Sequence, residues 1–213
     1  MTDVKGSTED PIGNSLSIAV FGDSHSVIYQ FITLPDKKID VTYLGPWTMN
    51  RIGRDGVPDK IFDSKIKPDI LMAVFGEIDI RCHILKQADT LKQTTQAVID
   101  KLVDEFFTAL LKAASKYKVK IIIRGVVPPT DVKENPEFPI YGTLQQRVLA
   151  TKALNAKLAE MASKTGMHFL DVYTEFATED GTLRKDFSDS NVHIDVEQRA
   201  KIATALQNCC KVL

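Results

Sequence analysis

Residues 70–75, ILMAVF, form a continuous apolar run, and residues 120–127, KIIIRGVV, form a second run that is nearly continuous. A half-exposed strand alternates apolar and polar residues, whereas a strand buried on both faces of a parallel sheet is apolar almost throughout. The two runs therefore predict central strands of a parallel sheet. Shorter runs rich in β-branched residues predict three more strands, at residues 17–21, 41–44 and 168–172.

Helical patterns separate the later strands. Between residues 93 and 116, apolar residues recur at the i, i+4, i+8 spacing of one helix face. A second helix is predicted over residues 144–164, ended by Gly166, and a third begins after Asp195, which has Gln198 at capping-box spacing. This alternation predicts an α/β fold, a three-layer α/β/α sandwich around a mostly parallel five-stranded sheet.

The composition is typical of one globular domain. The chain has 213 residues, of which 44% are hydrophobic, enough for one well-buried core. We predict a flexible N-terminal tail over residues 1–15 and a single domain over residues 16–213. The 28 acidic and 27 basic residues nearly cancel, leaving a formal charge of -1, so neither nucleic acid nor an anionic membrane is an expected partner.

The sequence also bears on location. It has no apolar run long enough to span a membrane, and its polar first residues do not resemble a secretory signal. The three cysteines are an odd number, and two of them, Cys209 and Cys210, are adjacent, which favours reduced thiols over a disulfide framework. We therefore expect a cytoplasmic protein; the sequence does not indicate its oligomeric state.

The segment after the first predicted strand, residues 21–26, reads FGDSHS. Ligands of open parallel sheets bind beyond the carboxyl ends of the strands, where Ser24 is expected to lie. A helix that begins there directs backbone N–H groups toward an anion forming near Ser24. The alternative is that Asp23 or Ser24 only caps that helix, which is common for these residue types.

A serine hydroxyl needs a base to remove its proton, and that base is usually a histidine held by a third group. Of four histidines, His193 lies in residues 188–193, SDSNVH, just before the last predicted helix and at the same edge of the sheet. Alone, it also fits an ordinary surface-loop histidine. Asp189 is the predicted orienting acid, and Asp195 is the rival, although its capping spacing indicates that the helix end occupies it.

Four segments in this order carry a resemblance: GDSHS at 22–26, LGP at 44–46, GEID at 76–79 and the segment that ends at His193. The chain resembles the SGNH (GDSL-like) hydrolase superfamily, and within it a subset often linked with carbohydrate substrates. The resemblance implies a flavodoxin-like fold and ester hydrolysis through an acyl-serine intermediate.

The resemblance also implies roles for individual residues. Ser24 would attack, His193 would shuttle the proton, and the N–H groups of Ser24 and Gly45 would bind the oxyanion. The substrate would be a small-molecule or carbohydrate ester that loses a short acyl group, most simply acetyl, with no metal or organic cofactor. The residues expected to contact it are Asp23, Gly76, Glu77, Asp79 and Pro128.

Two positions depart from the superfamily pattern. Ile78 stands where the superfamily has an asparagine that donates to the oxyanion, and removal of one such donor can cost about 100- to 1000-fold in rate. We expect Arg81 to compensate, either as a direct donor or by positioning neighbouring acids. The second departure is Ser190 three residues before His193, because the nearest aspartate, Asp189, stands one residue further back.

Other segments leave alternatives open. In extended backbone the alternate polar residues of the segment 76–83 would project to one side, either as a wall of the active site or as an internally paired loop; a metal site there is a weaker possibility. Trp47 fits a sugar-binding rim or a partly buried core position. Residues 128–142 contain four prolines and form either a cover over the substrate or a surface connection.

Two functions compete with an esterase. In an acyltransferase, a sugar hydroxyl instead of water would resolve the acyl-serine. In a binding module, the fold would persist without catalysis. Ile78 and Ser190 favour the binding module, whereas Ser24 and His193 oppose it.

Overall fold

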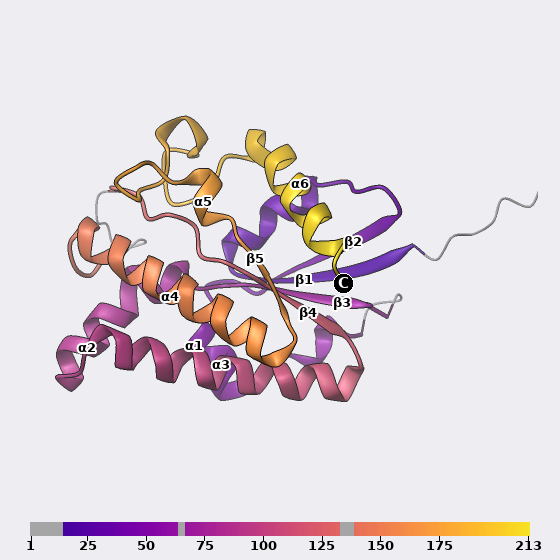
Figure 1. Cartoon of the computed structure of the whole chain (residues 1–213), viewed down its shortest axis with the longest axis horizontal. Helices are drawn as coiled ribbons and strands as arrows, with labels where there is room; N and C mark the ends of the chain where they lie inside the picture. The colour runs from indigo at the N-terminus through magenta and orange to yellow at the C-terminus, as the bar shows by residue number, and fades with distance from the viewer. Residues whose placement is uncertain (1–14, 64–66, 133–138) are drawn as a thin grey trace, which may run out of the picture.

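The structure is a computed structural model that describes residues 15–63, 67–132 and 139–213. Its centre is a five-stranded sheet in the order β2-β1-β3-β4-β5 (Figure 1). Every strand pair is parallel. The strands are β1 (Leu16–Gly22), β2 (Lys37–Tyr43), β3 (Ile70–Val74), β4 (Lys120–Arg124) and β5 (His168–Leu170).

All five predicted strands are present, with shifted ends. β2 begins four residues before the predicted 41, and β4 ends at Arg124, short of the predicted 127. Of the predicted tail, residues 1–14 lie outside the described residues, as do residues 133–138 of the proline-rich segment.

The three predicted helices are confirmed with small differences. The first is α3 (Thr95–Tyr117). The second, α4 (Leu144–Thr165), ends at Gly166 in the left-handed conformation, with φ of 70°, as the sequence indicated. The third region divides into a 3₁₀ turn, η5 (Val196–Gln198), and α6 (Arg199–Cys210), so Asp195 caps the turn rather than the long helix.

The remaining helical elements are shorter. They are η1 (Ser24–Phe31), α1 (Met49–Asp55), η2 (Asp59–Ile61), η3 (Asp79–Ile84), α2 (Leu85–Leu91), α5 (Tyr173–Phe176) and η4 (Lys185–Phe187).

The helices cover both faces of the sheet, and this explains the continuous apolar strands. In β1, Ala19 and Phe21 pack into a core with α1, α3 and α4, whereas Ile18 and Val20 pack into a second core with η1 and α6. Figure 1 shows α5 and α6 above the sheet and α3 and α4 below it. Within the described ranges, no helix is both long and apolar enough to cross a membrane.

Candidate active site

The turn at the end of β1 places Ser24 at the edge of the sheet. A side chain on Gly22 would bring its Cβ within 2.1 Å of the carbonyl oxygen of Val74 in β3, so only glycine fits there. The N–H of Asp23 donates to the same oxygen at 3.2 Å. Ser24 follows directly as the first residue of η1.

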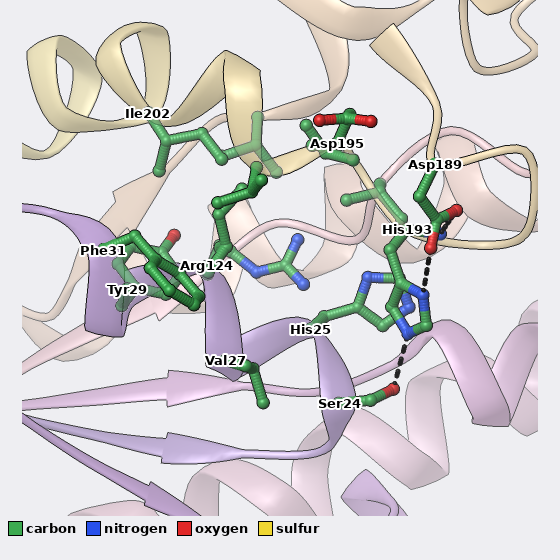
Figure 2. Close-up of a pocket in the computed structure, with 15 residues that line it drawn as sticks. Ser24, His25, Val27, Tyr29, Phe31, Arg124, Asp189, His193, Asp195 and Ile202 are labelled. Atoms are coloured by element: carbon green, nitrogen blue, oxygen red, sulfur yellow. Dashed lines mark hydrogen bonds and ion pairs between the residues drawn. The ribbon is translucent and has the colours of Figure 1, made fainter.

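Asp23 caps η1, as the capping alternative for this segment predicted. Its Oδ1 accepts the N–H of His25 at 2.9 Å. Ser24 makes a different contact, because its Oγ lies 2.8 Å from Nε2 of His193, a residue 169 positions further along the chain. The capping function of Asp23 therefore leaves the Ser24 hydroxyl directed at the histidine (Figure 2).

Asp189 completes a chain of hydrogen bonds, which we call the triad: Ser24, His193 and Asp189. Oδ2 of Asp189 lies 2.9 Å from Nδ1 of His193. With the Nδ1 proton directed at this carboxylate, Nε2 is left as an acceptor for the Ser24 hydroxyl. The side chains of His193 and Asp189 are 26% and 34% exposed, so the triad opens to solvent on the histidine side.

The loop that carries Asp189 and His193 is closed by its own hydrogen bonds. An isolated antiparallel bridge joins Ser188 to Ile194. Inside it, the N–H of Asp189 donates to the carbonyl of His193 at 3.1 Å, and Oδ1 of Asp189 accepts the N–H of Asn191 at 2.8 Å. Ser190 takes a left-handed conformation, with φ of 69°. This conformation accommodates the one additional residue between aspartate and histidine.

Asp195 lies in the same region but has another partner. Its Oδ1 accepts the N–H of Glu197 at 2.8 Å at the start of η5. The structure therefore brings Asp189, and not Asp195, to the imidazole of His193.

The two backbone N–H groups expected to bind an oxyanion come from adjacent strands. In the parallel register of β1 and β2, Gly22 pairs with Tyr43, so Ser24 and Gly45 each stand two residues beyond the same pair. The N–H of Leu44 donates to the carbonyl of Gly22 at 2.9 Å and holds the two segments together. Gly45 itself has φ of 75°, in the left-handed region that favours glycine.

The segment after β3 is helical, so the expectation of an extended polar wall is wrong. Residues 79–84 form a π-helical stretch, and residues four apart then share a face, as Glu77 and Arg81 do. Nε and Nη2 of Arg81 donate to the two carboxylate oxygens of Glu77 at 2.7 and 3.2 Å, and Nη1 donates to the carbonyl of Pro139 at 3.0 Å. These contacts fit a positioning role for Arg81; within the described ranges they direct its guanidinium to Glu77 and Pro139 rather than to Ser24.

Asp79 and His83 do not join the ion pair of Glu77 and Arg81. Asp79 is buried and accepts the N–H groups of Met49 and Asn50 at 2.9 and 3.4 Å, which fixes the start of α1. His83 is exposed. Across the described ranges, no three histidine, cysteine, aspartate or glutamate side chains converge as metal ligands.

Buried ionisable groups lie directly behind the triad. The ring of His25 packs against that of His193, with centroids 4.6 Å apart, and its Nε2 lies 3.8 Å from Oε2 of Glu77. Burial lowers the pKa of His25 to about 4, so its ring is neutral near pH 7. Burial raises the pKa of Glu77, but its interactions with His25 and Arg81 outweigh this and bring the pKa to about 2.

Asp23 differs from Glu77. One of its carboxylate oxygens, Oδ2, is buried with no hydrogen-bond partner among the described residues. Burial raises the pKa of Asp23 to about 7, although the positive charge of Arg124 opposes the shift. Asp23 is therefore a weak source of negative charge near neutral pH.

A cavity of about 390 Å³ opens beside Ser24 and His193 (Figure 2), a volume within the range of small-molecule sites. Its wall is largely apolar and includes Val27 and Ile202. The five residues that the sequence predicted to bind substrate do not line this cavity, and their contact with substrate stays a prediction.

Arg124, the last residue of β4, lines the cavity and was missed by sequence reasoning. The available signal was an arginine inside the apolar run 120–127, because arginine is almost never fully buried unless paired.

Three of the five predicted substrate residues, Gly76, Pro128 and Glu77, lie in closely packed surroundings. A Cβ on Gly76, which has φ of 111°, would lie 2.5 Å from Cγ2 of Val126. Pro128 and Glu77 line a separate crevice of about 10 Å³, which is too small for a substrate.

Trp47 packs against the core on the α3 face, and the guanidinium of Arg51 lies 3.9 Å from its ring centroid. This supports the core alternative for Trp47 over a sugar-binding rim.

No family model matches this sequence, and no curated protein matches it either. Solved structures do share its fold. A GDSL-like lipase from Bacteroides thetaiotaomicron is 15% identical, with a TM-score of 0.63, and the match covers 95% of this chain and 92% of the lipase. The chain has the SGNH hydrolase fold.

Two further structures with this fold are described as an esterase and a lipase. The aryl esterase of M. smegmatis has a TM-score of 0.58 and 15% identity over 93% of this chain and 99% of its own. The extracellular lipase of Streptomyces rimosus has a TM-score of 0.55 and 13% identity over 91% and 99%. The SGNH fold accounts for the five-stranded parallel sheet with helices on both faces.

Proposed function

We propose that this chain is a serine ester hydrolase that acts through an acyl-serine intermediate. The observation that carries the proposal is the pair of contacts at His193, 2.8 Å from Nε2 to Ser24 Oγ and 2.9 Å from Nδ1 to Asp189 Oδ2. A histidine held between a carboxylate and a serine hydroxyl is the arrangement that activates serine nucleophiles on unrelated folds.

The chemistry follows from these positions. Ser24 Oγ attacks the ester carbonyl carbon while Nε2 of His193 takes the hydroxyl proton. The C–O bond to the alcohol then breaks, and the imidazolium returns the proton to the leaving oxygen. Water attacks the acyl-serine with the same proton transfers in reverse order, which releases the acid and restores the Ser24 hydroxyl.

The surroundings of His193 support its role as a base. The imidazolium that forms is stabilised by Asp189. The neighbouring His25 ring is neutral, because burial lowers its pKa to about 4, so it does not oppose the new positive charge. The N–H groups of Ser24 and Gly45 stand at matching places beyond paired strands and are our candidates for the oxyanion donors.

The narrower features of the function remain predictions. A short acyl group, such as acetyl, and a carbohydrate alcohol follow from the sequence resemblance alone. The covered face of Trp47 and the apolar cavity wall favour a small ester with carbon-rich parts over an extended sugar. A cytoplasmic location is likewise a prediction, in keeping with free thiols at Cys82, Cys209 and Cys210.

Hydrolysis of p-nitrophenyl acetate tests the proposal. We expect a burst of p-nitrophenol equal to the number of sites, followed by slower turnover, and a loss of roughly 10⁴-fold or more in kcat for Ser24→Ala and for His193→Ala. His83→Ala is the matched control, because this exposed histidine lies on η3, away from the triad.

Other outcomes separate the alternatives. Turnover that persists in both triad variants contradicts the proposal. Absence of any burst or turnover in the folded protein favours a binding module. Transfer of the acetyl group to an added alcohol, in preference to water, favours an acyltransferase.

A further inference from the structure

The largely apolar cavity beside Ser24 is lined by one arginine, Arg124, and by two carboxylates, Asp189 and Asp195, which the structure engages with His193 and with the N–H of Glu197. Arg124 is only 4% exposed and lines this cavity together with Tyr29, Val127 and Val172. Figure 2 shows its guanidinium inside the cavity, on the side of His25 and His193. A charged group on the wall of an apolar cavity beside a nucleophile is the kind of convergent polar feature that fixes a ligand's orientation.

Arg124 has no ion pair within the part of the chain that the structure describes. Its Nε is buried without a hydrogen-bond partner there, and the Oη of Tyr29, another group of the wall, is also without one. Burial of an arginine normally requires a carboxylate or several acceptors, because an unpaired charge in an apolar environment is costly.

The nearest acids do not compensate for this charge. The negative charge of Glu77 attracts the Arg124 guanidinium from a distance. Both carboxylate oxygens of Glu77, however, already accept hydrogen bonds from Arg81. Asp23 has its pKa raised to about 7 by burial, and no contact within 4.0 Å joins it to Arg124 in the described structure. The cation is therefore kept in the cavity without a permanent partner.

We propose that Arg124 is the anion-binding residue of a substrate subsite, and that the ester taken by this site carries a carboxylate separated from the ester bond by apolar carbons. This inference rests on the proposed ester hydrolysis and names its substrate class. A guanidinium suits a carboxylate because its planar N–H groups match the two oxygens. The apolar wall then covers the carbons between the two ends of the substrate.

The effect of Arg124→Met on thermal stability distinguishes a ligand-binding role of Arg124 from a purely structural one. Removal of one partner from a buried ion pair destabilises a protein, whereas replacement of an unpaired buried charge by an apolar side chain of similar length relieves desolvation. We therefore expect Arg124→Met to unfold at the same or a higher temperature than the parent protein. A clear decrease in melting temperature would assign Arg124 to the fold.

Matched substrates test the subsite, with the carboxylate placed on either side of the ester. For the acyl side, the mono-p-nitrophenyl ester of adipate is compared with p-nitrophenyl hexanoate, in which a methyl group replaces the carboxylate. For the alcohol side, para-acetoxybenzoate is compared with para-tolyl acetate.

We expect one anionic member to be preferred by about 10- to 100-fold in kcat/KM, the range of a hydrogen-bonded contact to a charged group. Arg124→Met should abolish that preference while hydrolysis of the neutral ester persists, and Arg124→Lys should keep part of it. Arg54→Met removes one positive charge from an exposed position on α1 and should leave the preference unchanged.

The results distinguish failure of this inference from failure of the esterase proposal. Hydrolysis of the neutral esters with no anionic preference, or with a preference that survives in Arg124→Met, overturns the subsite and leaves the esterase intact. If no ester is hydrolysed, thermal stabilisation by hexanoate is compared with that by hexanamide. A larger shift with hexanoate that disappears in Arg124→Met supports an anion site, and equal shifts overturn it.

Discussion

At the scale of single residues, two aspartates compete for His193 and their hydrogen bonds separate them. Asp189 contacts His193 twice: its Oδ2 lies 2.9 Å from Nδ1 of the imidazole, and its Oδ1 accepts the backbone N–H of His193 at 3.2 Å. The carboxylate of Asp195 instead accepts the N–H of Glu197 at the start of η5. The orienting acid proposed for the triad is therefore Asp189, although it stands one residue further from the histidine than in the superfamily pattern.

Asp189→Asn should reduce kcat by about 10⁴-fold, because an amide in this place favours the wrong tautomer of the imidazole. Asp195→Asn is the matched control: its amide oxygen still accepts the N–H of Glu197, so activity should stay near the parent value. Steady-state hydrolysis of p-nitrophenyl acetate measures both. The opposite ranking of the two variants would transfer the orienting role to Asp195.

At the scale of elements, the segment after β3 shows where a sequence pattern was misinterpreted. In extended backbone, alternate polar residues would share one face, but a helical segment brings together residues four apart. Glu77 and Arg81 therefore form a buried ion pair, with side chains 11% and 8% exposed, and Asp79 turns to α1. The pattern gave these polar residues the period of an extended chain, whereas the segment has a helical period.

Glu77→Gln should destabilise the fold by about 3–5 kcal/mol, because it leaves the buried Arg81 guanidinium without its carboxylate. The double variant with Arg81→Met should cost less than the sum of the single variants, which reports coupling between the two side chains. Urea denaturation measures each value.

The exposed pair of Lys101 and Glu105 on α3 has the same spacing and provides the control. Glu105→Gln should barely change the midpoint of the urea transition, since exposed ion pairs contribute little. Equal effects of Glu77→Gln and Glu105→Gln would show that the pair behind the triad has no structural importance.

The sequence predicted the frame of the fold better than the cavity. Continuous apolar runs identified β3 and β4, and the helix-stop glycine identified the end of α4, because these signals depend on burial and local conformation. The cavity wall comes from η1, β4 and α6, which lie far apart in the sequence. Their convergence depends on tertiary packing, so no local pattern identifies it. The sequence predicts that Arg124 belongs to a strand, which is confirmed, but not that Arg124 lines the cavity.

At the scale of the whole molecule, the free energy of unfolding depends on pH, because burial raises the pKa of carboxyl groups in the interior. Burial raises the pKa of Asp23 from 3.8 to about 7. A carboxyl group with a higher pKa in the native state binds its proton more strongly when folded. Stability is therefore full below the unfolded value and is lost as pH rises toward the folded value.

Asp23→Asn removes this titration while keeping an acceptor for the N–H of His25. We expect the variant to gain stability relative to the parent protein between pH 4 and pH 7, by on the order of 3 kcal/mol, with little further change above pH 8. Melting temperatures of both proteins over this range measure the difference. A difference that does not vary with pH would mean that Asp23 titrates normally in the native state.

The central claim is that Ser24 is the activated nucleophile, and covalent labelling tests it most directly. A fluorophosphonate probe reacts with serines that a base deprotonates, and peptide mass spectrometry locates the adduct. We predict modification of Ser24 alone, with slow labelling in His193→Ala; Ser26 should stay unmodified, because it is 0% exposed and its hydroxyl donates to the carbonyl of Asp23 at 2.7 Å. An adduct on another residue, or none on a preparation that hydrolyses esters, would contradict the account.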